Sequence, residues 1–437
     1  MQLHGWGCFP VVDAEIVEPI NADSLQALLG AKRKQASLIA RGAGKSYGDS
    51  ALANRVLSSR FLDSYIALDE DNSRIRCGAG VTLDSILKIA VPRGWFLPVL
   101  PGTKWISVGG AIAADVHGKN HHLDGSFCDH IIELSLATAS GEVLVCNRKQ
   151  NSEVFYATCG GMGLTGVILD ATLNFDKVSS VLINRQSLLA DNIEHCFELI
   201  EEHTECKYSV AWLDCLASGT TLGRSVLHLG EHAVDGKLQY KARRGPSIPF
   251  NTPRFLLNKF TMSVFNSTLY SLRKRGKEKS TVNYDAYFFP LDNIGNWNRL
   301  YGSKGFLQYQ FVLPQEAALE GMQEILQKVS GAGKGSFLAV LKKFGKANKN
   351  LLSFPMGGYT LTLDFKWEKQ IFPLLDELDQ IVIDKGGRHY LAKDARVSEA
   401  VFKAGYPKWK KFLMVKHRLD PDNIFASHQS DRIGLTG

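Results

Sequence analysis

Hydrophobic and polar positions follow two different patterns along the chain. Up to about residue 178, short apolar runs are separated by glycine-rich turns, as in "SLIARGAGKSYGDS", and this predicts short strands joined by loops. The run "IIELSLATASGEVLVC" predicts a hairpin, and "GLTGVILDATLNF" predicts a further strand. One helix is expected in "TLDSILKIAVPRG", with Thr82 and Asp84 at its start and Pro92 near its end.

Beyond residue 178 the segments are longer and amphipathic. "ADNIEHCFELIEEH" and "PQEAALEGMQEILQKVSGAG" have the spacing of helices with one apolar face, and "GFLQYQFVLP" and "GGYTLTLDF" are typical of strands. This order predicts an antiparallel sheet covered by helices. The last section, "EAVFKAGYPKWKKFLMVKHRLDPDNIFAS", predicts one helix and a tail.

These patterns predict an α+β protein in three parts. The parts are residues 1–178, residues 179–395 and a C-terminal segment, residues 396–437, that packs back on the first part. The chain of 437 residues is long enough for more than one hydrophobic core. The first part has no regular βαβ rhythm and no GxGxxG after its first strand, so we expect no Rossmann domain.

The charge of the chain is concentrated in one segment. Between Lys237 and Lys279 there are eleven Lys or Arg residues and one acid, Glu278, which gives about +10 and leaves about −3 for the remainder of the net +7. A local excess of this kind indicates an anionic partner for that segment. The charge is not accompanied by an RNA- or DNA-binding motif, so we expect no nucleic-acid partner.

Cysteine spacing and hydropathy point to a reducing, aqueous compartment. The eight cysteines include no CxxC pair, which disfavours a structural zinc site and a disulfide framework. No apolar run reaches 18 residues, and the N-terminus lacks the pattern of a secretory signal. The expected location is cytoplasmic, with peripheral contact to the inner membrane face.

Three glycine-rich segments are the strongest chemical signal. "RGAGKSYGDS" begins at Arg41 and resembles a P-loop, but that motif requires glycine at position 39, where the chain has Ile39. "LPGTKWISVGGAIAADVHGKNHH" and "GGMGLTGVILDATL" follow at residues 100–122 and 160–173. Glycine allows backbone N–H groups to approach a pyrophosphate closely, so the three segments together predict a site for one long, flat, phosphorylated ligand.

In this order the segments resemble the FAD-binding domain of the vanillyl-alcohol oxidase, or p-cresol methylhydroxylase (PCMH)-type, flavoproteins. Within that superfamily, "HGKNHH", "LQYQ", "AKDAR" and "DPDNIFAS" resemble the branch of decaprenylphosphoryl-β-D-ribose 2′-oxidases. The likeness runs from Gly5 to about Ser427. It implies that residues 1–178 are a PCMH-type FAD-binding domain and residues 179–395 a substrate-binding domain. Many relatives attach FAD covalently through a histidine of the first loop; Lys45 stands there, so non-covalent FAD is expected.

The resemblance also assigns site residues. FAD would be held by Arg41, Gly42, Ala43, Gly44, Lys45, Ser46, Tyr47, Gly48, Asp49, Gly102, Ser107, Val108, Gly109, Gly110, Ala114, Asp115, His117, Gly166, Val167, Ile168 and Tyr390. The implied catalytic residues are Lys393, His117 and Tyr47. The implied substrate-binding residues are Lys119, Gln308, Gln310 and Lys342, and no metal is expected.

The residue types give these roles independent support. Gln308 and Gln310 are two apart on an expected strand, so they face the same side, where two amides suit a polyhydroxyl ligand. Lys342 could meet a phosphate, although a solvated strand end is the alternative. Lys393 could accept a hydroxyl proton or stabilise negative charge on a reduced flavin, and the sequence leaves both roles open. Thr362 stands where the mycobacterial relatives carry cysteine.

The implied activity is FAD-dependent oxidation of the 2′-hydroxyl of a polyprenyl-phosphate-linked ribose to the 2′-keto sugar. This would be the first half of an epimerisation to the arabinose form in cell-wall synthesis, completed by a separate keto-sugar reductase. The nearest alternative is an aldonolactone or alditol oxidase of the same superfamily. Two others are a metal hydrolase built on His117, His121, His122 and His130, whose spacing matches no zinc pattern, and a lipid-binding protein without flavin. We expect His121 and His122 to hydrogen-bond loop backbone instead.

The basic segment has an apolar middle, which suggests contact with a membrane. Its apolar members are Phe250, Phe255, Leu256, Leu257, Phe260, Met262, Phe265, Leu269 and Leu272. The segment would rest on anionic lipid while a polyprenyl tail stays in the bilayer. An ordinary helix with a basic surface loop is the alternative.

Overall fold

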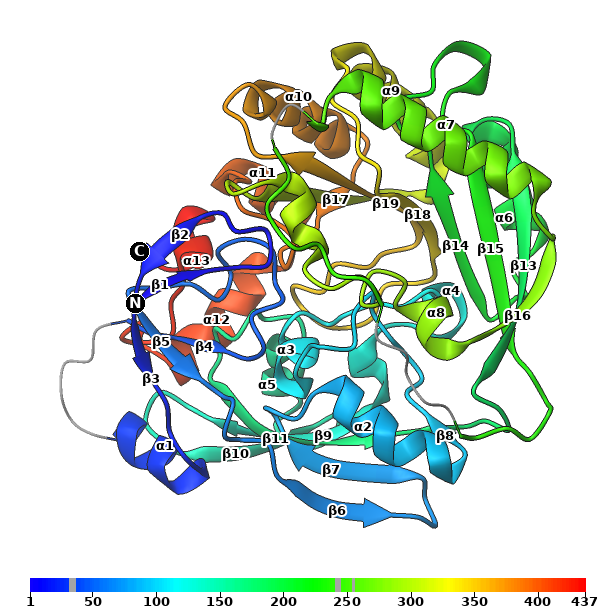
Figure 1. Ribbon diagram of the computed structural model, residues 1–437. Helices are drawn as coiled ribbons and strands as arrows, with labels where there is room; N and C mark the ends of the chain where they lie inside the picture. Colours follow the sequence, from blue (N-terminus) through cyan, green and yellow to red (C-terminus); the bar gives the residue numbers. More distant parts are fainter. Residues whose placement is uncertain (31–36, 240–244, 254–255) are drawn as a thin grey trace.

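The computed structural model describes residues 1–30, 37–239, 245–253 and 256–437 (Figure 1). Phe255 and four of the basic residues of the segment from Lys237 to Lys279, namely Lys241, Arg243, Arg244 and Arg254, lie outside the described residues. The chain mixes helices with largely antiparallel sheets, which confirms the predicted α+β class. In the described residues, no helix is both long and apolar enough to cross a membrane.

The N-terminal part is built on two sheets. A three-stranded parallel sheet has the order β3 (Glu15–Val17), β5 (Arg55–Ser58), β4 (Ile39–Arg41). A five-stranded antiparallel sheet has the order β10 (Val143–Asn147), β9 (Ile131–Ala137), β11 (Val167–Asn174), β7 (Arg74–Gly78), β6 (Tyr65–Asp69). The strands β9 and β10 form the predicted hairpin. Two small two-stranded sheets pair β1 (Gln2–His4) with β2 (Val11–Asp13), and β8 (Trp95–Phe96) with β12 (Asp176–Lys177).

Short helices complete this part and place the glycine-rich segments. They are α1 (Ala22–Gly30), α2 (Leu83–Ala90), α3 (Val108–Ala113), α4 (His121–Asp124) and α5 (Ser152–Thr158). The Thr82 side chain accepts from the backbone N–H of Ser85, so the predicted cap of α2 is confirmed. The glycine loop of residues 41–50 directly follows β4, and α3 lies in the second glycine-rich segment, between the two large sheets in Figure 1.

The second part is one eight-stranded sheet in which every neighbouring pair is antiparallel. Its order is β16 (Lys279–Asn283), β13 (Leu182–Ala190), β15 (Ser225–His232), β14 (Tyr208–Leu213), β18 (Ala339–Phe344), β19 (Gly358–Lys366), β17 (Phe306–Pro314), β20 (Arg388–His389). The helices α6 (Ile193–Glu202), α9 (Gln315–Ala332) and α10 (Ile371–Asp384) pack on one face, where their apolar sides form one core with the sheet. The helices α7 (Lys259–Arg275) and α8 (Tyr284–Phe288) lie outside this core.

Alternation along the central strands explains how the sheet serves both a core and a site. In β17, the side chains of Leu307, Tyr309, Phe311 and Leu313 enter the core under the helices. Gln308 and Gln310 therefore point to the opposite face. The same alternation in β18 and β19 puts Lys342 and Thr362 on that face.

The C-terminal section differs from its prediction. Instead of one helix it forms α11 (Glu399–Gly405) and α12 (Trp409–Leu419), and the tail adds α13 (His428–Arg432). The break falls at Tyr406 and Pro407, because proline lacks an N–H and forces the preceding residue out of the helical region; Tyr406 has φ −122° and ψ 73°.

The C-terminal helices pack on the N-terminal part. Helix α12 contacts α5, and Phe412 belongs to the N-terminal core. Arg432 forms ion pairs with Asp49 at 2.7 Å and with Asp394 at 2.9 Å. The division of the chain at residues 178 and 395 stays a prediction.

Candidate active site

A cavity of about 1210 Å³ lies between the N-terminal part and the open face of the eight-stranded sheet. All three glycine-rich segments line it. The residues expected to bind FAD that line the cavity are Gly42, Ala43, Gly44, Lys45, Ser46, Tyr47, Gly102, Ser107, Gly109, Gly110, Ala114, His117, Gly166, Val167, Ile168 and Tyr390. The cavity also contains Lys119, Gln308, Gln310, Lys342 and Lys393 in its wall. The three glycine segments and the predicted substrate residues thus meet in one space.

The first two glycine segments touch through Gly42. A Cβ atom on Gly42 would overlap Oγ of Ser107, which caps α3 by accepting from the N–H of Gly110. Gly44 has φ +64°, a left-handed conformation that glycine adopts without strain. Glycine is required at these two positions because one closes the contact between loops and the other turns the chain along the cavity.

Five residues expected to bind FAD lie behind the wall. They are Arg41, Gly48, Asp49, Val108 and Asp115. The Arg41 guanidinium donates to the carbonyl oxygen of His4 at 2.7 Å, and Asp49 pairs with Arg432. Val108 is part of the hydrophobic core. Contact of these five residues with the cofactor stays a prediction.

Asp115 ties the N-terminal part to the loop between β18 and β19. It is fully buried and has φ +39°. Its carboxylate accepts from Nδ2 of Asn348 and of Asn350, both at 2.8 Å, from Oγ of Ser353 at 2.6 Å and from the backbone N–H of Cys128 at 3.0 Å. These four donors compensate the burial of the charge.

A hydrogen bond connects Gln310 to His117 across the cavity wall. Nε2 of Gln310 lies 3.1 Å from Nε2 of His117 and 3.2 Å from Oγ1 of Thr360, whose hydroxyl donates to the carbonyl of Phe311. The amide nitrogen therefore donates to His117, and burial holds the pKa of His117 well below its ordinary value. A neutral ring that accepts at Nε2 carries its proton on Nδ1, and this buried N–H has no acceptor among the described residues.

Gln308 makes a different contact, to a carboxylate that the sequence analysis did not single out. Its Nε2 donates to Oδ1 of Asp364 at 2.6 Å, and the hydroxyl of Tyr301 donates to Oδ2 at 3.1 Å. Asp364 is fully buried, and burial raises its pKa to about 7. Gln308 and Asp364 are directly paired across β17 and β19, and this register is the signal that the strand patterns alone did not contain.

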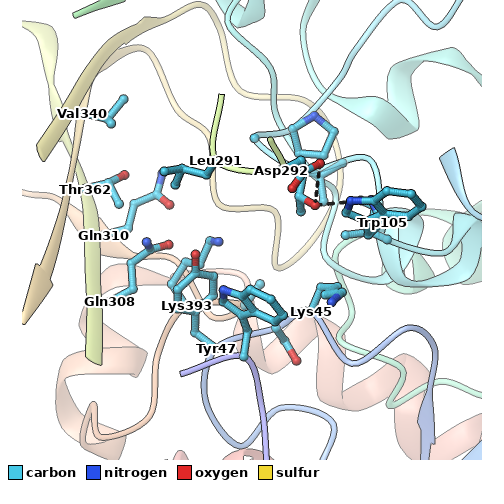
Figure 2. A pocket seen from close by; sticks show the side chains of 18 of the residues that line it. Lys45, Tyr47, Trp105, Leu291, Asp292, Gln308, Gln310, Val340, Thr362 and Lys393 are labelled. Carbon is cyan, nitrogen blue, oxygen red and sulfur yellow. Dashed lines mark hydrogen bonds between the residues drawn. The ribbon is translucent and has the colours of Figure 1, made fainter. Parts of the chain in front are cut away.

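Lys393 follows β20 and points into the same side of the cavity. Figure 2 shows it gathered with Gln308 and Gln310, with Asp292 and Trp105 across from them. Its Nζ lies 3.8 Å from the centroid of the Tyr47 ring. Burial lowers the pKa of Lys393 to about 7; nearby Asp364 opposes this shift and Lys342 adds to it. An amine with this pKa is present in both protonation states near neutral pH.

The sequence neighbours of Lys393 have other partners. Asp394 pairs with Arg432, and Arg396 pairs with Asp376 and Asp379. The acid that acts on Lys393 is Asp364, which comes from a strand and is distant in sequence.

Two further lysines, Lys119 and Lys342, are half-buried in the cavity wall. Burial lowers the pKa of Lys342 to about 8 and, together with Lys342, lowers the pKa of Lys119 to about 7. Lys119 donates to the carbonyl oxygens of Tyr287 and Phe288, so its ammonium is anchored to α8. Lys342 is therefore not a solvated strand end. Its neighbour Lys343 forms an ion pair with Glu201.

The remaining histidines of this region bond to backbone. Nδ1 of His121 accepts from the N–H of Gly345 at 3.1 Å, and Nε2 of His122 lies 2.9 Å from the carbonyl of Cys206, which confirms the expected structural roles. Nε2 of His130 lies 2.8 Å from the carbonyl of Asp124. In the described residues, no group of three His, Cys, Asp or Glu side chains is placed to hold a metal ion.

Comparison with known proteins assigns the first two glycine-rich segments to a family. The family described as "FAD binding domain" matches residues 14–147, and the family described as "D-arabinono-1,4-lactone oxidase" matches residues 360–433. Decaprenylphosphoryl-beta-D-ribose oxidase of Mycolicibacterium smegmatis is 36% identical over an alignment that covers 99% of this chain and 97% of that protein.

Two other relatives cover most of the chain. An uncharacterized protein of Streptomyces coelicolor is 31% identical over 81% of this chain and 100% of its own length. L-gulono-1,4-lactone dehydrogenase of Mycobacterium tuberculosis is 22% identical over 96% of this chain and 95% of its own length. The lactone-oxidising relative is therefore much more distant than the sugar oxidase.

The residues of the cavity fit FAD. The volume of the cavity exceeds the range of about 300–1,000 Å³ that is typical of small-molecule sites, as a dinucleotide together with a substrate requires. A Cβ atom on Gly102, which lines the cavity, would meet no described atom within 4 Å, and the buried Nδ1–H of His117 lacks an acceptor within the described parts of the chain. Both features suit a large ligand with many hydrogen-bond acceptors.

The two findings agree, since the matched FAD-binding region contains the first two glycine-rich segments that line the cavity, and the full-length similarity extends to the third segment and to the polar face of the eight-stranded sheet. The chain belongs to the FAD-dependent oxidoreductase family of decaprenylphosphoryl-β-D-ribose oxidase.

Proposed function

We propose that this protein oxidises the 2′-hydroxyl of a polyprenyl-phosphate-linked ribose to the 2′-keto sugar. The observation that carries the proposal is the position of Lys393, a half-buried amine with a pKa of about 7, beside Gln308 and Gln310 in a cavity lined by the three glycine segments. FAD, when bound, supplies the two-electron acceptor for the hydrogen that leaves the sugar carbon.

The protein's own residues manage the proton of the alcohol. In its neutral form Lys393 accepts the hydroxyl proton at Nζ, and the Tyr47 ring and Asp364 stabilise the resulting ammonium. Near neutral pH both forms of Lys393 are populated, which suits a group that must accept a proton and later release it.

The amides and lysines orient the substrate. Gln308 and Gln310 each retain an amide oxygen and are held by Asp364 and His117, so they present fixed hydrogen-bonding groups to a sugar. Lys342, with a pKa of about 8, is mostly protonated at pH 7 and supplies a positive charge for the phosphate.

We propose non-covalent FAD, held by the loop and strand residues that line the cavity. Lys45 lines the wall with Nζ 4.0 Å from the centroid of the Trp6 ring, and an amine at this position does not provide the histidine attachment of other relatives. Acid denaturation should release all flavin into the supernatant. Flavin that stays with the precipitated chain would contradict this point.

The second candidate substrate is an aldonolactone, because residues 360–433 match the D-arabinono-1,4-lactone oxidase family. Analysis of the products formed from each candidate substrate separates the two candidates. The polyprenyl-phosphate-linked ribose should yield a product lighter by two hydrogens, while D-arabinono-1,4-lactone should not. Oxidation of the lactone alone would make it the substrate.

Peripheral membrane contact is the second part of the proposal, and α7 supports it. Phe260 and Val264, four residues apart on one side of α7, are 75% and 49% exposed, and Arg273, Lys274 and Arg275 end the helix. Each cation near an anionic surface contributes on the order of 1 kcal/mol. Binding to anionic vesicles should exceed binding to neutral ones and fall with salt. Equal binding to both would leave α7 as an ordinary surface helix.

The keto product implies a partner reaction. A 2′-keto sugar that is reduced from the opposite face becomes the arabinose form, so a separate reductase must consume the product. Incubation with oxidase alone should therefore accumulate the ketone.

A further inference from the structure

A second, smaller cavity of about 330 Å³ lies at the C-terminal end of α7. It is formed by this helix end, the following turn and the strands β13 and β16, with the lining residues Arg185, Ser187, Leu269, Leu272, Arg273, Gly276, Lys277 and Ser280. Arg185, Leu269 and Arg273 also line the main cavity. The two spaces therefore share a wall.

Three cations, Arg185, Arg273 and Lys277, line this cavity. Among the described residues, no carboxylate forms an ion pair with Arg185, Arg273 or Lys277. The adjacent acid, Glu278, accepts from Nε2 of Gln186. By contrast, Arg224, which directly precedes β15, is held by two hydrogen bonds to Asp214.

Arg185 and Arg273 both line the cavity, one from β13 and one from α7. Burial and, to a smaller extent, the positive charge of Arg273 lower the pKa of Arg185, as expected for two nearby cations. An anion placed between them would offset their repulsion. The charges that line the cavity therefore favour binding of a negative ligand.

The donor set selects the class of anion. Two guanidinium groups and an ammonium offer charge-assisted hydrogen bonds, and the hydroxyls of Ser187 and Ser280 lie in the same wall. Nε of Arg185 already donates to Oγ of Ser280 at 3.2 Å, which orients the guanidinium. This combination is typical of sites for the tetrahedral oxygens of a phosphate group.

The position of the cavity indicates where the phosphate comes from. Leu272 lines it and is 61% exposed, and the same helix carries the exposed Phe260. A phosphate held here would have apolar side chains beside it, the arrangement of a lipid headgroup above its acyl chains. We propose that the cavity of Arg185, Arg273 and Lys277 binds the phosphodiester of an anionic membrane lipid. This inference rests on the proposed membrane contact of α7.

Two double variants with equal charge change test the proposal. Arg273→Gln with Lys277→Gln removes two cations of the cavity. Arg275→Gln with Lys279→Gln removes two neighbouring cations that line neither cavity. The holoenzymes are sedimented with phosphatidylcholine vesicles that contain phosphatidylglycerol, and with vesicles of matched surface charge in which oleate replaces phosphatidylglycerol. Bound flavin and circular dichroism verify that each variant is folded.

The cavity variant should bind phosphatidylglycerol vesicles about tenfold more weakly than the control variant, which retains the same net charge. On oleate vesicles the two variants should bind equally, because only general attraction acts there. Equal binding on phosphatidylglycerol would overturn the proposal, as would the same difference on both vesicle types.

A soluble ligand distinguishes the source of the phosphate. Calorimetry with dihexanoyl-phosphatidylglycerol below its micellar concentration should give binding to the wild type and the control variant, but not to the cavity variant. Tighter binding of inorganic phosphate than of this lipid would overturn the assignment to a lipid. These measurements need no sugar substrate. A wild-type protein that oxidises no lipid-linked ribose would therefore refute the proposed reaction, but it would leave the proposal of a lipid-binding cavity to these binding measurements.

Discussion

Nζ of Lys393 lies 3.8 Å from the centroid of the Tyr47 ring, so a lysine from the loop after β20 is held against the first glycine-rich loop. The contact is reinforced by the hydrogen bond from the N–H of Tyr47 to the carbonyl of Ala392 at 3.0 Å. The residue proposed to move the proton is thus positioned directly by the loop proposed to hold FAD.

Replacement of Lys393 by alanine should leave FAD bound and remove most of its reduction by substrate. Loss of a positioned base costs about 10²- to 10⁴-fold in rate, and Lys393 is one of many residues in the cavity wall. Anaerobic single-turnover reduction, with flavin content measured in parallel, checks this. Reduction at the wild-type rate would place the proton acceptor elsewhere.

The rate of flavin reduction should depend on pH through Lys393. Its pKa is about 7 and the neutral amine is the active form, so the rate should rise as pH passes through about 7 and then level off. The Asp364 carboxylate raises the pKa of Lys393, so Asp364→Asn should shift the profile to lower pH while the limiting rate at high pH stays near that of the wild type. A variant with an unchanged midpoint and a lower rate at every pH would mean that Asp364 has only a structural role.

Asp364 also illustrates what the sequence could not reveal. The alternation of "GFLQYQFVLP" was enough to place Gln308 and Gln310 on one face, since side chains two apart on a strand point the same way. It could not give the register of β17 against β19, which is set by the whole sheet and pairs Gln308 with Asp364. The role of Asp364 could therefore not be predicted from the strand pattern of "GGYTLTLDF", in which it lies.

The fold shows the same division. Local patterns predicted the α+β class, the hairpin of β9 and β10 and the cap of α2, because each depends on neighbouring residues. The cavity at the end of α7 and the support of the wall by Asp115 depend on segments that are far apart along the chain. The helix break at Pro407, by contrast, follows from a local signal, the proline itself.

Gly48→Ala should disturb the site from behind its wall. A Cβ atom there would overlap the carbonyl oxygen of Asp394, next to Lys393, and overpacking of this kind costs about 1–3 kcal/mol. We expect both lower stability to denaturant and slower flavin reduction. Gly331→Ala in α9 is the matched control, since its Cβ meets open space, and it should be neutral or stabilising by about 0.5–1 kcal/mol. If Gly48→Ala has the same stability and the same rate of flavin reduction as that control, the loop of Gly48 does not support the loop of Lys393.

Lys342→Gln should weaken the binding of substrates that carry the phosphate. Loss of a charge-assisted hydrogen bond of about 1.5–3 kcal/mol corresponds to roughly a tenfold to hundredfold higher KM. Lys343→Gln is the control, because Lys343 is the next residue on β18 and pairs with Glu201. KM is compared for a ribose phosphodiester and for free ribose. An equal rise in KM for both sugars would show that Lys342 does not recognise the phosphate.

The most direct test of the central claim is anaerobic mixing of the purified yellow holoenzyme with polyprenyl-phosphate-linked ribose while flavin absorbance is followed. The absorbance should bleach in a single turnover and the 2′-keto sugar should form in equal amount, whereas the 2′-deoxyribose analogue should cause no bleaching. Bleaching by the 2′-deoxy analogue, or none with the ribose substrate, would contradict the proposed reaction.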